Sequence, residues 1–185
     1  MNKIILISFL FISLDLCSAQ TLNKILVQDA KQDINQLIST IESVHYNPFH
    51  KIDKHTILEK KDSLFLNWKK DSISYREFTK SGMWITSLMS NGHTSFDWQN
   101  PLLFPELISS SFLPLKAKLV KNKLVVTYSR SELVEVGDTI TSINDLDSVS
   151  LFKDVMGLTG GIDSFKRAVS EKLFPLYLFF FLKED

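Results

Sequence analysis

The sequence predicts an α+β protein, in which an amino-terminal three-helix bundle is followed by a small β-rich module. In three segments before Met89, apolar residues recur every three or four positions, which is typical of amphipathic helices. After Gly92 the apolar residues alternate with polar ones instead, which is typical of half-buried strands. Residues 89–96, where the first pattern gives way to the second, are therefore the stretch around which the predicted fold is organised.

The amino terminus has the composition of a secretory signal peptide. Lys3 gives it a basic start, residues 4–16 are mostly apolar, and small residues follow as far as Ala19. The apolar core is too short to cross a bilayer, which takes about 20 residues. Cys17 would also suit a lipoprotein, but residues 14–16 (Leu-Asp-Leu) lack the small side chains of a lipoprotein signal. We therefore predict that residues 1–19 are a cleaved signal peptide and that the protein is exported, to the periplasm or beyond the cell, with no transmembrane segment in the mature chain.

The charge and cysteine content exclude several classes of site. Cleavage after Ala19 removes the only cysteine, so we expect neither a disulfide nor a thiolate metal site in the mature chain. The 21 basic and 21 acidic residues give a formal net charge of zero. A balanced charge gives no electrostatic reason to expect binding to nucleic acid or to an anionic membrane.

The first two helices are predicted over residues 29–46 and residues 54–69. Asp29 is the predicted N-cap of the first helix, with Gln32 in the capping-box position. Pro48 ends this helix, because the residue before a proline is driven out of the helical conformation.

The third helix is predicted to begin at a capping box formed by Ser74 and Glu77. Its apolar stripe continues to Met89. Gly92 follows at a position suited to the left-handed residue that commonly ends a helix.

The β-rich region is predicted to begin with a strand at residues 94–98. An irregular connection follows at residues 100–106, which contain two prolines. Strands over residues 113–120 and 124–128 then form a hairpin through a tight turn at Lys121 and Asn122.

The last part of the chain is predicted to be helical, with a short helix over residues 148–156 that ends at Gly157. Gly160 and Gly161 indicate a loop or hinge, and a further helix is predicted over residues 163–172. Residues 173–182 are uncharged and almost wholly apolar, yet too short to cross a membrane. Burying one Phe or Leu side chain is worth about 1.5–3 kcal/mol, so we expect a partner surface or a further domain to cover this run.

Residues 136–144, Val-Gly-Asp-Thr-Ile-Thr-Ser-Ile-Asn, resemble the second half of a PDZ domain. In those domains a Gly-Asp turn leads into a strand, and a short helix follows. Gly137 permits the turn conformation, and we expect Ile140 and Ile143 to point into a small core. The glycine loop that opens an ordinary PDZ domain is not visible around residues 112–119.

The amino-terminal half resembles the helical cap of the tail-specific (C-terminal-processing) serine peptidases, in their secreted, tricorn-like branch. The matching positions are Asp33, Ile34, His45, Asn47, Pro48, Phe49, Ser74, Glu77, Asn91, Gly92, His93 and Thr94. Family members have His-Pro-Asn-x-Tyr and Asp-Gly-His-Thr, in this order, before a PDZ-like domain. Here Tyr46 replaces the first proline, Phe49 the tyrosine and Asn91 the aspartate.

The resemblance covers most of residues 29–161 and implies a division of the chain. Residues 20–98 would be the helical cap domain, residues 112–160 the PDZ-like module, and residues 161–185 an apolar segment leading into an absent catalytic domain. The family activity is hydrolysis of peptide bonds through an acyl-enzyme intermediate, on a peptide or protein substrate and without a cofactor. His93 would be the catalytic general base for a serine of the missing domain.

Two roles remain open for His93. It can titrate near neutral pH and could serve a serine hydroxyl within hydrogen-bond reach. Alternatively, it is a structural residue that fixes the corner between helix and strand. His45, His50 and His55 recur every five residues, which would scatter their side chains around a helix, so we predict no metal site.

The sequence therefore predicts a truncated or non-catalytic member of an exported serine peptidase family. The chain would then be a fragment that lacks the domain bearing the nucleophile. The alternative is a peptide- or protein-binding module of the cell envelope without enzymatic activity. Such a module would add a partner strand to the edge of its PDZ-like sheet.

Overall fold

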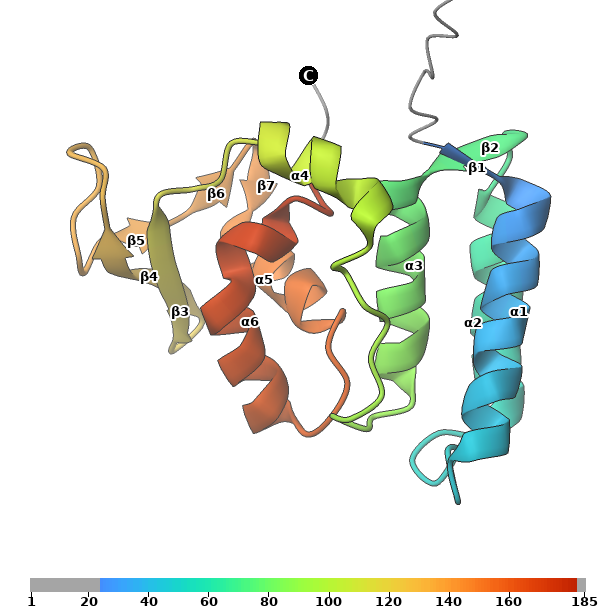
Figure 1. Ribbon diagram of the computed structural model, residues 1–185. Coiled ribbons are helices and arrows are strands. Elements are labelled where there is room, and N and C mark those ends of the chain that lie inside the picture. The colour runs from blue at the N-terminus through green and yellow to red at the C-terminus, as the bar shows by residue number, and fades with distance from the viewer. Residues whose placement is uncertain (1–23, 183–185) are drawn as a thin grey trace, which may run out of the picture.

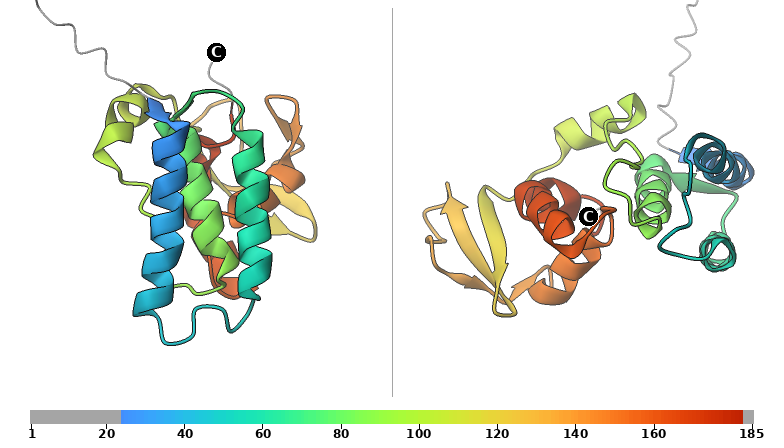
Figure 2. Two further views of the ribbon diagram at one scale, coloured as in Figure 1. Left: turned by 90° about the vertical axis from the view of Figure 1, so that its right-hand side faces the viewer. Right: turned by 90° about the horizontal axis from the view of Figure 1, so that it is seen from below.

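Three helices lie side by side at the amino-terminal end of the structure, a computed structural model that describes residues 24–182. They are α1 (Val27–Val44), α2 (Lys54–Asn67) and α3 (Tyr75–Leu88), with α3 between the other two and the rest of the molecule (Figure 1, Figure 2). A two-stranded antiparallel ribbon of β1 (Lys24–Leu26) and β2 (Ser72–Ser74) joins them at one end. The predicted signal peptide, residues 1–19, lies outside the described residues.

The three helices share one apolar core, because each has a stripe of apolar side chains on its inner face. The buried members are Val27, Ala30, Ile34, Ile38, Ile41, Ile57, Trp68, Ile73, Phe78, Ile85 and Met89. The structure is thus of mixed helix and sheet, which confirms the predicted α+β class at that level.

The start of α1 differs from the prediction. Leu26 is the N-cap and makes no side-chain cap bond, while Asp29 lies in the first turn. The helix begins earlier because β1 leads directly into it, and Val27 N donates to Asp71 O at 2.9 Å. The predicted cap of α3 is confirmed, since Ser74 Oγ accepts a hydrogen bond from Glu77 N at 3.1 Å.

The end of α3 also differs from the prediction. Met89 is the C-cap, and Ser90 with φ 51° is the left-handed residue, not Gly92. The predicted strand at residues 94–98 is wrong as well, since these residues form a loop along α3. Its alternating burial has another cause: Phe96 lies against Gly82, where an added Cβ would come within 2.6 Å of the Phe96 ring.

The segment predicted as an irregular connection is largely helical. It forms a 3-10 turn η1 (Pro101–Leu103) followed by α4 (Phe104–Ser109). Asn100 starts the turn, because its side chain accepts a hydrogen bond from Leu102 N at 3.0 Å. The two prolines occupy first-turn positions, where a missing N–H costs nothing.

The predicted hairpin is confirmed, with strands β3 (Leu115–Val120) and β4 (Lys123–Ser129) pairing antiparallel. Lys121 and Asn122 have φ 46° and 60°, as a two-residue hairpin turn requires. The short strand β5 (Thr139–Ile140) adds to β4, giving the order β3-β4-β5. A second hairpin joins β6 (Ser142–Ile143) to β7 (Leu146–Asp147).

Two helices complete the fold beside this sheet, α5 (Ser148–Met156) and α6 (Asp163–Leu178). The predicted bounds of α5 are confirmed, including its C-cap at Gly157. Asp147 caps its start by accepting a hydrogen bond from Ser150 N at 2.8 Å, and this bond lowers the pKa of the Asp147 carboxyl. Helix α6 continues beyond the predicted residue 172 and includes Pro175.

The apolar run at residues 173–182 lies in the protein's own core, contrary to the expectation that a partner must cover it. Its buried members are Phe174, Tyr177, Leu178, Phe179 and Phe180. They pack with side chains of β3, β4 and α5, and the Phe152 and Phe174 ring centroids are 5.4 Å apart. Burial within the chain therefore removes the physical reason that pointed to an outside surface.

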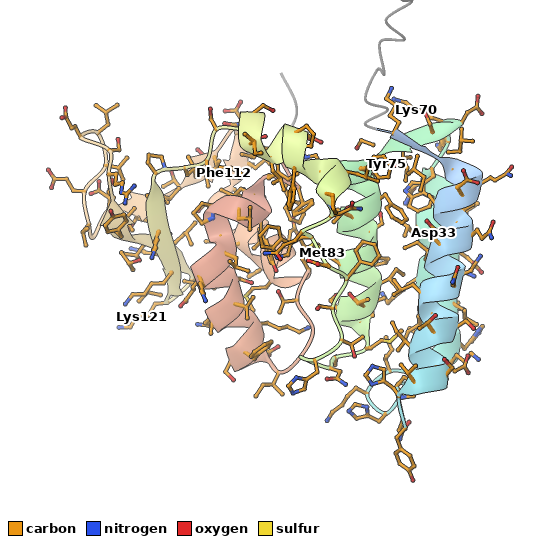
Figure 3. All side chains as sticks on the ribbon, viewed as in Figure 1. Asp33, Lys70, Tyr75, Met83, Phe112 and Lys121 are labelled. Carbon is orange, nitrogen blue, oxygen red and sulfur yellow. The ribbon has the colours of Figure 1, made fainter. Side chains whose placement is uncertain are left out.

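Helix α3 contributes to both halves of the structure. Its residue Met83 belongs to the core formed with α5, α6 and the sheet, and Figure 3 shows it between α3 and α6. Tyr75 and Trp84, also on α3, pack against both cores. Arg76 links α4 and the segment after α6 to α3: it pairs with Glu106 at 3.4 Å and donates a hydrogen bond to the Leu182 carbonyl.

No helix within residues 24–182 is both long enough and apolar enough to span a bilayer.

Candidate functional site

The loop that follows α3 holds His93 in a defined position. The Asn91 side chain accepts a hydrogen bond from His93 N at 3.0 Å, and Thr94 N donates to Asn91 O at 3.2 Å. These two bonds close a turn around Gly92. The side chain of Asn91 is therefore used to shape the loop.

A hydrogen bond joins this loop to the end of α1. His45, the C-cap of α1, has its Nε2 3.1 Å from Thr94 Oγ1, and Thr94 is buried. The bond connects residues that are 49 positions apart in the sequence. The two stretches in which the sequence resembles the peptidase cap are thus neighbours in space.

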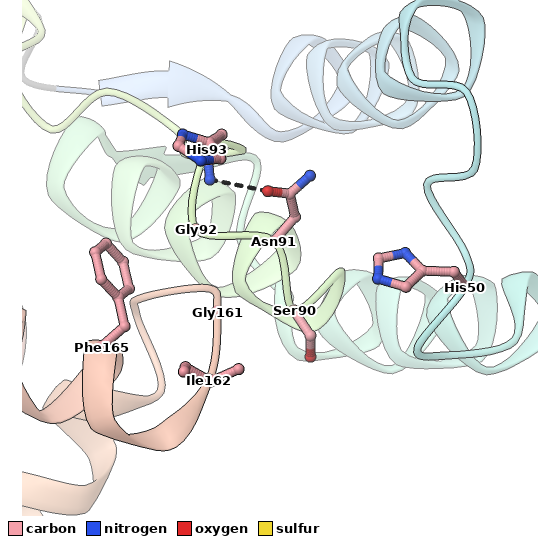
Figure 4. A pocket seen from close by; sticks show the side chains of 8 residues that line it. All are labelled: His50, Ser90, Asn91, Gly92, His93, Gly161, Ile162 and Phe165. Carbon is pink, nitrogen blue, oxygen red and sulfur yellow. Dashed lines mark hydrogen bonds between the residues drawn. The ribbon is translucent and has the colours of Figure 1, made fainter.

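His93 lies at the rim of a cavity of about 450 Å³. His50 faces the cavity from the segment after α1, while Ile162 and Phe165 line it from the start of α6 (Figure 4). The His50 ring is fixed by a contact of 3.0 Å between its Nδ1 and Asn47 O. Figure 4 shows the two imidazoles on different sides of the cavity.

The His93 imidazole is exposed and has no hydrogen-bond partner among residues 24–182. Both ring nitrogens can therefore reach a group supplied from outside this part of the chain. As a residue type, histidine can accept a hydroxyl proton and return it to a leaving group near neutral pH. Within the described part of the chain, neither a hydroxyl nor an orienting carboxylate bonds the His93 ring, as both would in a complete triad.

The four histidines of the described chain do not form a metal site. His45 contacts Thr94, His50 contacts Asn47, and His55 pairs with Glu59 at 3.5 Å on the surface of α2. Within residues 24–182, no three His, Cys, Asp or Glu side chains come together as metal ligands would.

Gly160 and Gly161, for which the sequence predicted only a loop or hinge, lie against the His93 loop. A Cβ added to Gly160 would lie 2.6 Å from Asn91 O, and one added to Gly161 would lie 3.4 Å from Gly92 Cα. Ser87 Oγ reinforces the contact by donating to Gly157 O at 2.6 Å. The backbones of the two loops can approach this closely because Gly160 and Gly161 have no Cβ to meet Asn91 and Gly92.

Phe165 and Ile162 were not predicted as site residues. They belong to a helix start some 70 positions after His93, and no local pattern distinguishes them from other apolar residues of an amphipathic helix. The Gly160-Gly161 pair was the one signal in the sequence, because glycines often mark a point where two backbones approach closely. In the structure Gly161 has φ +105°, which favours glycine.

The variant Gly160→Ala is expected to displace the Asn91 carbonyl and with it His93. The added methyl group meets backbone rather than a flexible side chain, so we expect a loss of about 1–3 kcal/mol in the free energy of unfolding. Urea unfolding measures this loss, and the imidazole NMR signals of His93 report the displacement.

Gly137→Ala is the matched control. Gly137 has φ +102° and no atom within 4 Å of an added Cβ, so its substitution strains only its own turn. We expect the His93 signals to stay in place in this variant. Unchanged His93 signals in Gly160→Ala would show that the glycine contact does not position the loop.

Comparison of the chain with models of protein families, with curated proteins and with solved structures gave no match.

Proposed function

We propose that this chain supplies the helical cap and the PDZ-like module of an exported serine-type peptidase of the tail-specific family, with His93 as the general base. The observation that supports this best is the contact between His45 and Thr94. It joins the two sequence stretches that resemble the family cap, and it leaves His93 accessible at the rim of a cavity.

The turn at Gly137 supports the PDZ-like part of the proposal. Gly137 N donates to Val126 O at 2.9 Å, and Val126 N donates to Asp138 O at 2.9 Å, so the Gly-Asp turn is fastened to β4. Ile143 is buried and Ile140 is half-buried, as a small core requires. The helix α5 follows directly after the β6–β7 hairpin.

In the proposed reaction, a serine hydroxyl from another domain attacks the carbonyl carbon of a peptide bond. His93 accepts the hydroxyl proton as the new C–O bond forms, and later donates it to the departing amine, which leaves an acyl-enzyme. Water then releases the acyl group by the same proton transfers in reverse order. No serine among residues 24–182 hydrogen-bonds His93, so we expect no peptidase activity from these residues alone.

A second candidate function is peptide or protein binding without catalysis. It is supported by exposed apolar side chains on one side of the molecule, around η1 and α4. These side chains are Leu102, Phe104, Ile108 and Phe112, with Ile108 84% exposed. Large exposed apolar groups that lie close together commonly indicate a protein-binding surface.

The two candidates differ in their response to a serine-reactive fluorophosphonate. We would isolate the native product from its source cells with an antibody raised against residues 24–98, measure its intact mass, and treat it with the reagent. Labelling of a product heavier than this chain would support the peptidase. A product of the chain's own mass that binds peptide but does not react would support the binding module.

A further inference from the structure

The hairpin of β3 and β4 concentrates positive charge in a protein whose formal net charge is zero. Residues 107–131 contain no Asp or Glu, and all of their basic side chains are exposed. These side chains are Lys116, Lys118, Lys121, Lys123 and Arg130. None of them forms an ion pair with a carboxylate among residues 24–182. The charge balance of the whole chain therefore conceals a strongly basic surface.

The alternation of β3 turns its lysines away from the core. Leu115 and Ala117 are buried in the core with α5 and α6, so Lys116 and Lys118 point to the opposite face of the sheet. Positions two residues apart on a strand are separated by about 7 Å. This is less than the Debye length of about 8 Å at physiological ionic strength, so the two charges act together on a partner.

Strand β4 adds to the same face, because side chains that are opposite each other on paired strands lie on one side of the sheet. Lys116 is opposite Tyr128, and Val120 is opposite Lys123. Arg130 Nε donates a hydrogen bond to the Tyr128 hydroxyl at 2.7 Å, which holds its guanidinium beside that ring. Val120 and Tyr128 are both exposed, so apolar surface lies between the cations.

The carboxylates that follow in the sequence do not pair with these cations. Glu132, Glu135 and Asp138 belong to the loop between β4 and β5. This loop is bonded to the side of β4 opposite β3, where Val126 N donates to Asp138 O. Asp138 Oδ2 is used within the loop, since it accepts a hydrogen bond from Glu135 N at 2.8 Å.

The basic face, defined by the five cations, is flat and outward. Figure 1 shows the hairpin at the end of the molecule opposite α1 and α2, and Figure 3 shows Lys121 at the outer end of the hairpin. None of the five cations lines any of five cavities of about 380–640 Å³ in the described residues. A small anionic ligand would need a concave site, so this face suits an extended surface instead.

Protection of a sheet edge does not account for the whole face. Lysines on an edge strand prevent its pairing with another chain, and this explanation fits Lys116 and Lys118 on the edge strand β3. It does not fit Lys123, which lies on the central strand β4. Nor does it fit Arg130, which follows that strand.

We propose that the basic face docks the protein onto an anionic lipid surface. About four to eight basic residues held close together are typical of segments that bind such surfaces. Their long apolar stems, with Val120 and Tyr128 between them, suit the boundary between headgroups and water. A protein partner fits less well, because lysine is depleted from protein interfaces, and single-stranded nucleic acid is usually held in a groove. The proposal concerns docking alone and does not depend on the peptidase function of His93.

Cosedimentation with vesicles tests the proposal. One set of vesicles is phosphatidylcholine alone, and the other is equal parts of phosphatidylcholine and phosphatidylglycerol. Each cation near an anionic surface strengthens binding about fivefold, so the protein should bind the phosphatidylglycerol vesicles at least about 100-fold more tightly. Salt at about 1 M shortens the Debye length to about 3 Å and should abolish the difference.

The triple variant Lys116→Gln, Lys118→Gln, Lys123→Gln removes three charges from the basic face and leaves polar side chains in their place. We expect it to bind the phosphatidylglycerol vesicles about 100-fold more weakly. Its binding to phosphatidylcholine alone should not change. Exposed substitutions of this kind have little effect on folding, which circular dichroism verifies.

The triple variant Lys60→Gln, Lys69→Gln, Lys70→Gln is the matched control. These lysines are exposed on α2 and just after it, and none pairs with a carboxylate among residues 24–182. The control changes the net charge by the same amount as the hairpin variant. It should bind the phosphatidylglycerol vesicles within about threefold of the unmodified protein, because charges beyond a Debye length are screened.

Equal binding to the two kinds of vesicle would overturn the proposal. So would an equal loss in the two triple variants, which would show that net charge and not the hairpin is responsible. Poly-L-glutamate and a single-stranded oligonucleotide are the further probes. If the hairpin variant loses binding to one of them and the unmodified protein does not bind vesicles, the proposal is wrong and the face belongs to an acidic protein or to nucleic acid.

Discussion

Replacing His93 with alanine is expected to slow fluorophosphonate labelling of the native product by about 10²–10⁴-fold, which is the usual contribution of general acid–base catalysis. The reagent reacts with a serine only when a base removes its proton. The His93 imidazole lies at the cavity rim with both nitrogens accessible, so it can reach a hydroxyl delivered by another domain. Labelling rates of the two proteins, compared over a range of pH, measure the effect.

Loss of a base has a signature that a merely structural change lacks. A base must be unprotonated to accept the hydroxyl proton, so the labelling rate of the unmodified protein should rise with pH, and His93→Ala should lose this dependence. Because His93 is exposed, we expect its removal to leave the free energy of unfolding within about 0.5 kcal/mol of its original value.

His55→Ala is the control for this experiment. His55 is exposed on α2, where it pairs with Glu59, and it does not line the cavity. Its loss should leave the labelling rate unchanged. If His93→Ala labels as fast as His55→Ala, His93 is not the base and the binding-module function is favoured.

Phe174→Ala is expected to lower the free energy of unfolding by about 3–5 kcal/mol, the usual cost of removing a buried aromatic ring. Phe174 is fully buried and packs against Phe152, and both belong to the core shared by α5, α6 and the sheet. Such a loss is a large fraction of the about 5–15 kcal/mol that stabilises a typical folded protein. Urea unfolding followed by circular dichroism measures the loss.

Phe112→Ala tests whether burial, rather than the loss of any phenylalanine, is responsible. Phe112 is 40% exposed, and we expect its substitution to cost about 1 kcal/mol or less. An equally small effect of Phe174→Ala would mean that the apolar run at residues 173–182 is not part of the core. In that case the expectation of an outside surface to cover it would stand again.

The parts of the fold that were predicted correctly depend on local sequence. The apolar stripes located the three amino-terminal helices, the Ser74–Glu77 cap fixed the start of α3, and Lys121-Asn122 fixed the hairpin. Residues 94–98 were predicted wrongly because alternating burial does not require a strand. An extended loop that lies along a helix buries every second side chain in the same way, as Phe96 does against Gly82.

The candidate site could be predicted only in part for a similar reason. His93 was identified from its place in a short motif, but its surroundings come from distant segments. The contact of Gly160 with Asn91 joins two loops about 70 residues apart, and nothing in either loop specifies the other. For the apolar run at residues 173–182, the need for burial could be predicted from the sequence. The elements that bury it, β3, β4 and α5, could not, because they are distant in the sequence.

Helix α3 contributes to both hydrophobic cores, and this should make their thermal unfolding cooperative. Its side chains belong to the core of the amino-terminal helices on one side and to the core of the sheet and α6 on the other, and Arg76 ties it to α4 and to Leu182. Unfolding of either core removes the contacts that hold α3 on that side, and this destabilises the other core. The protein should therefore lose its structure in one cooperative transition, although its sequence suggests two units.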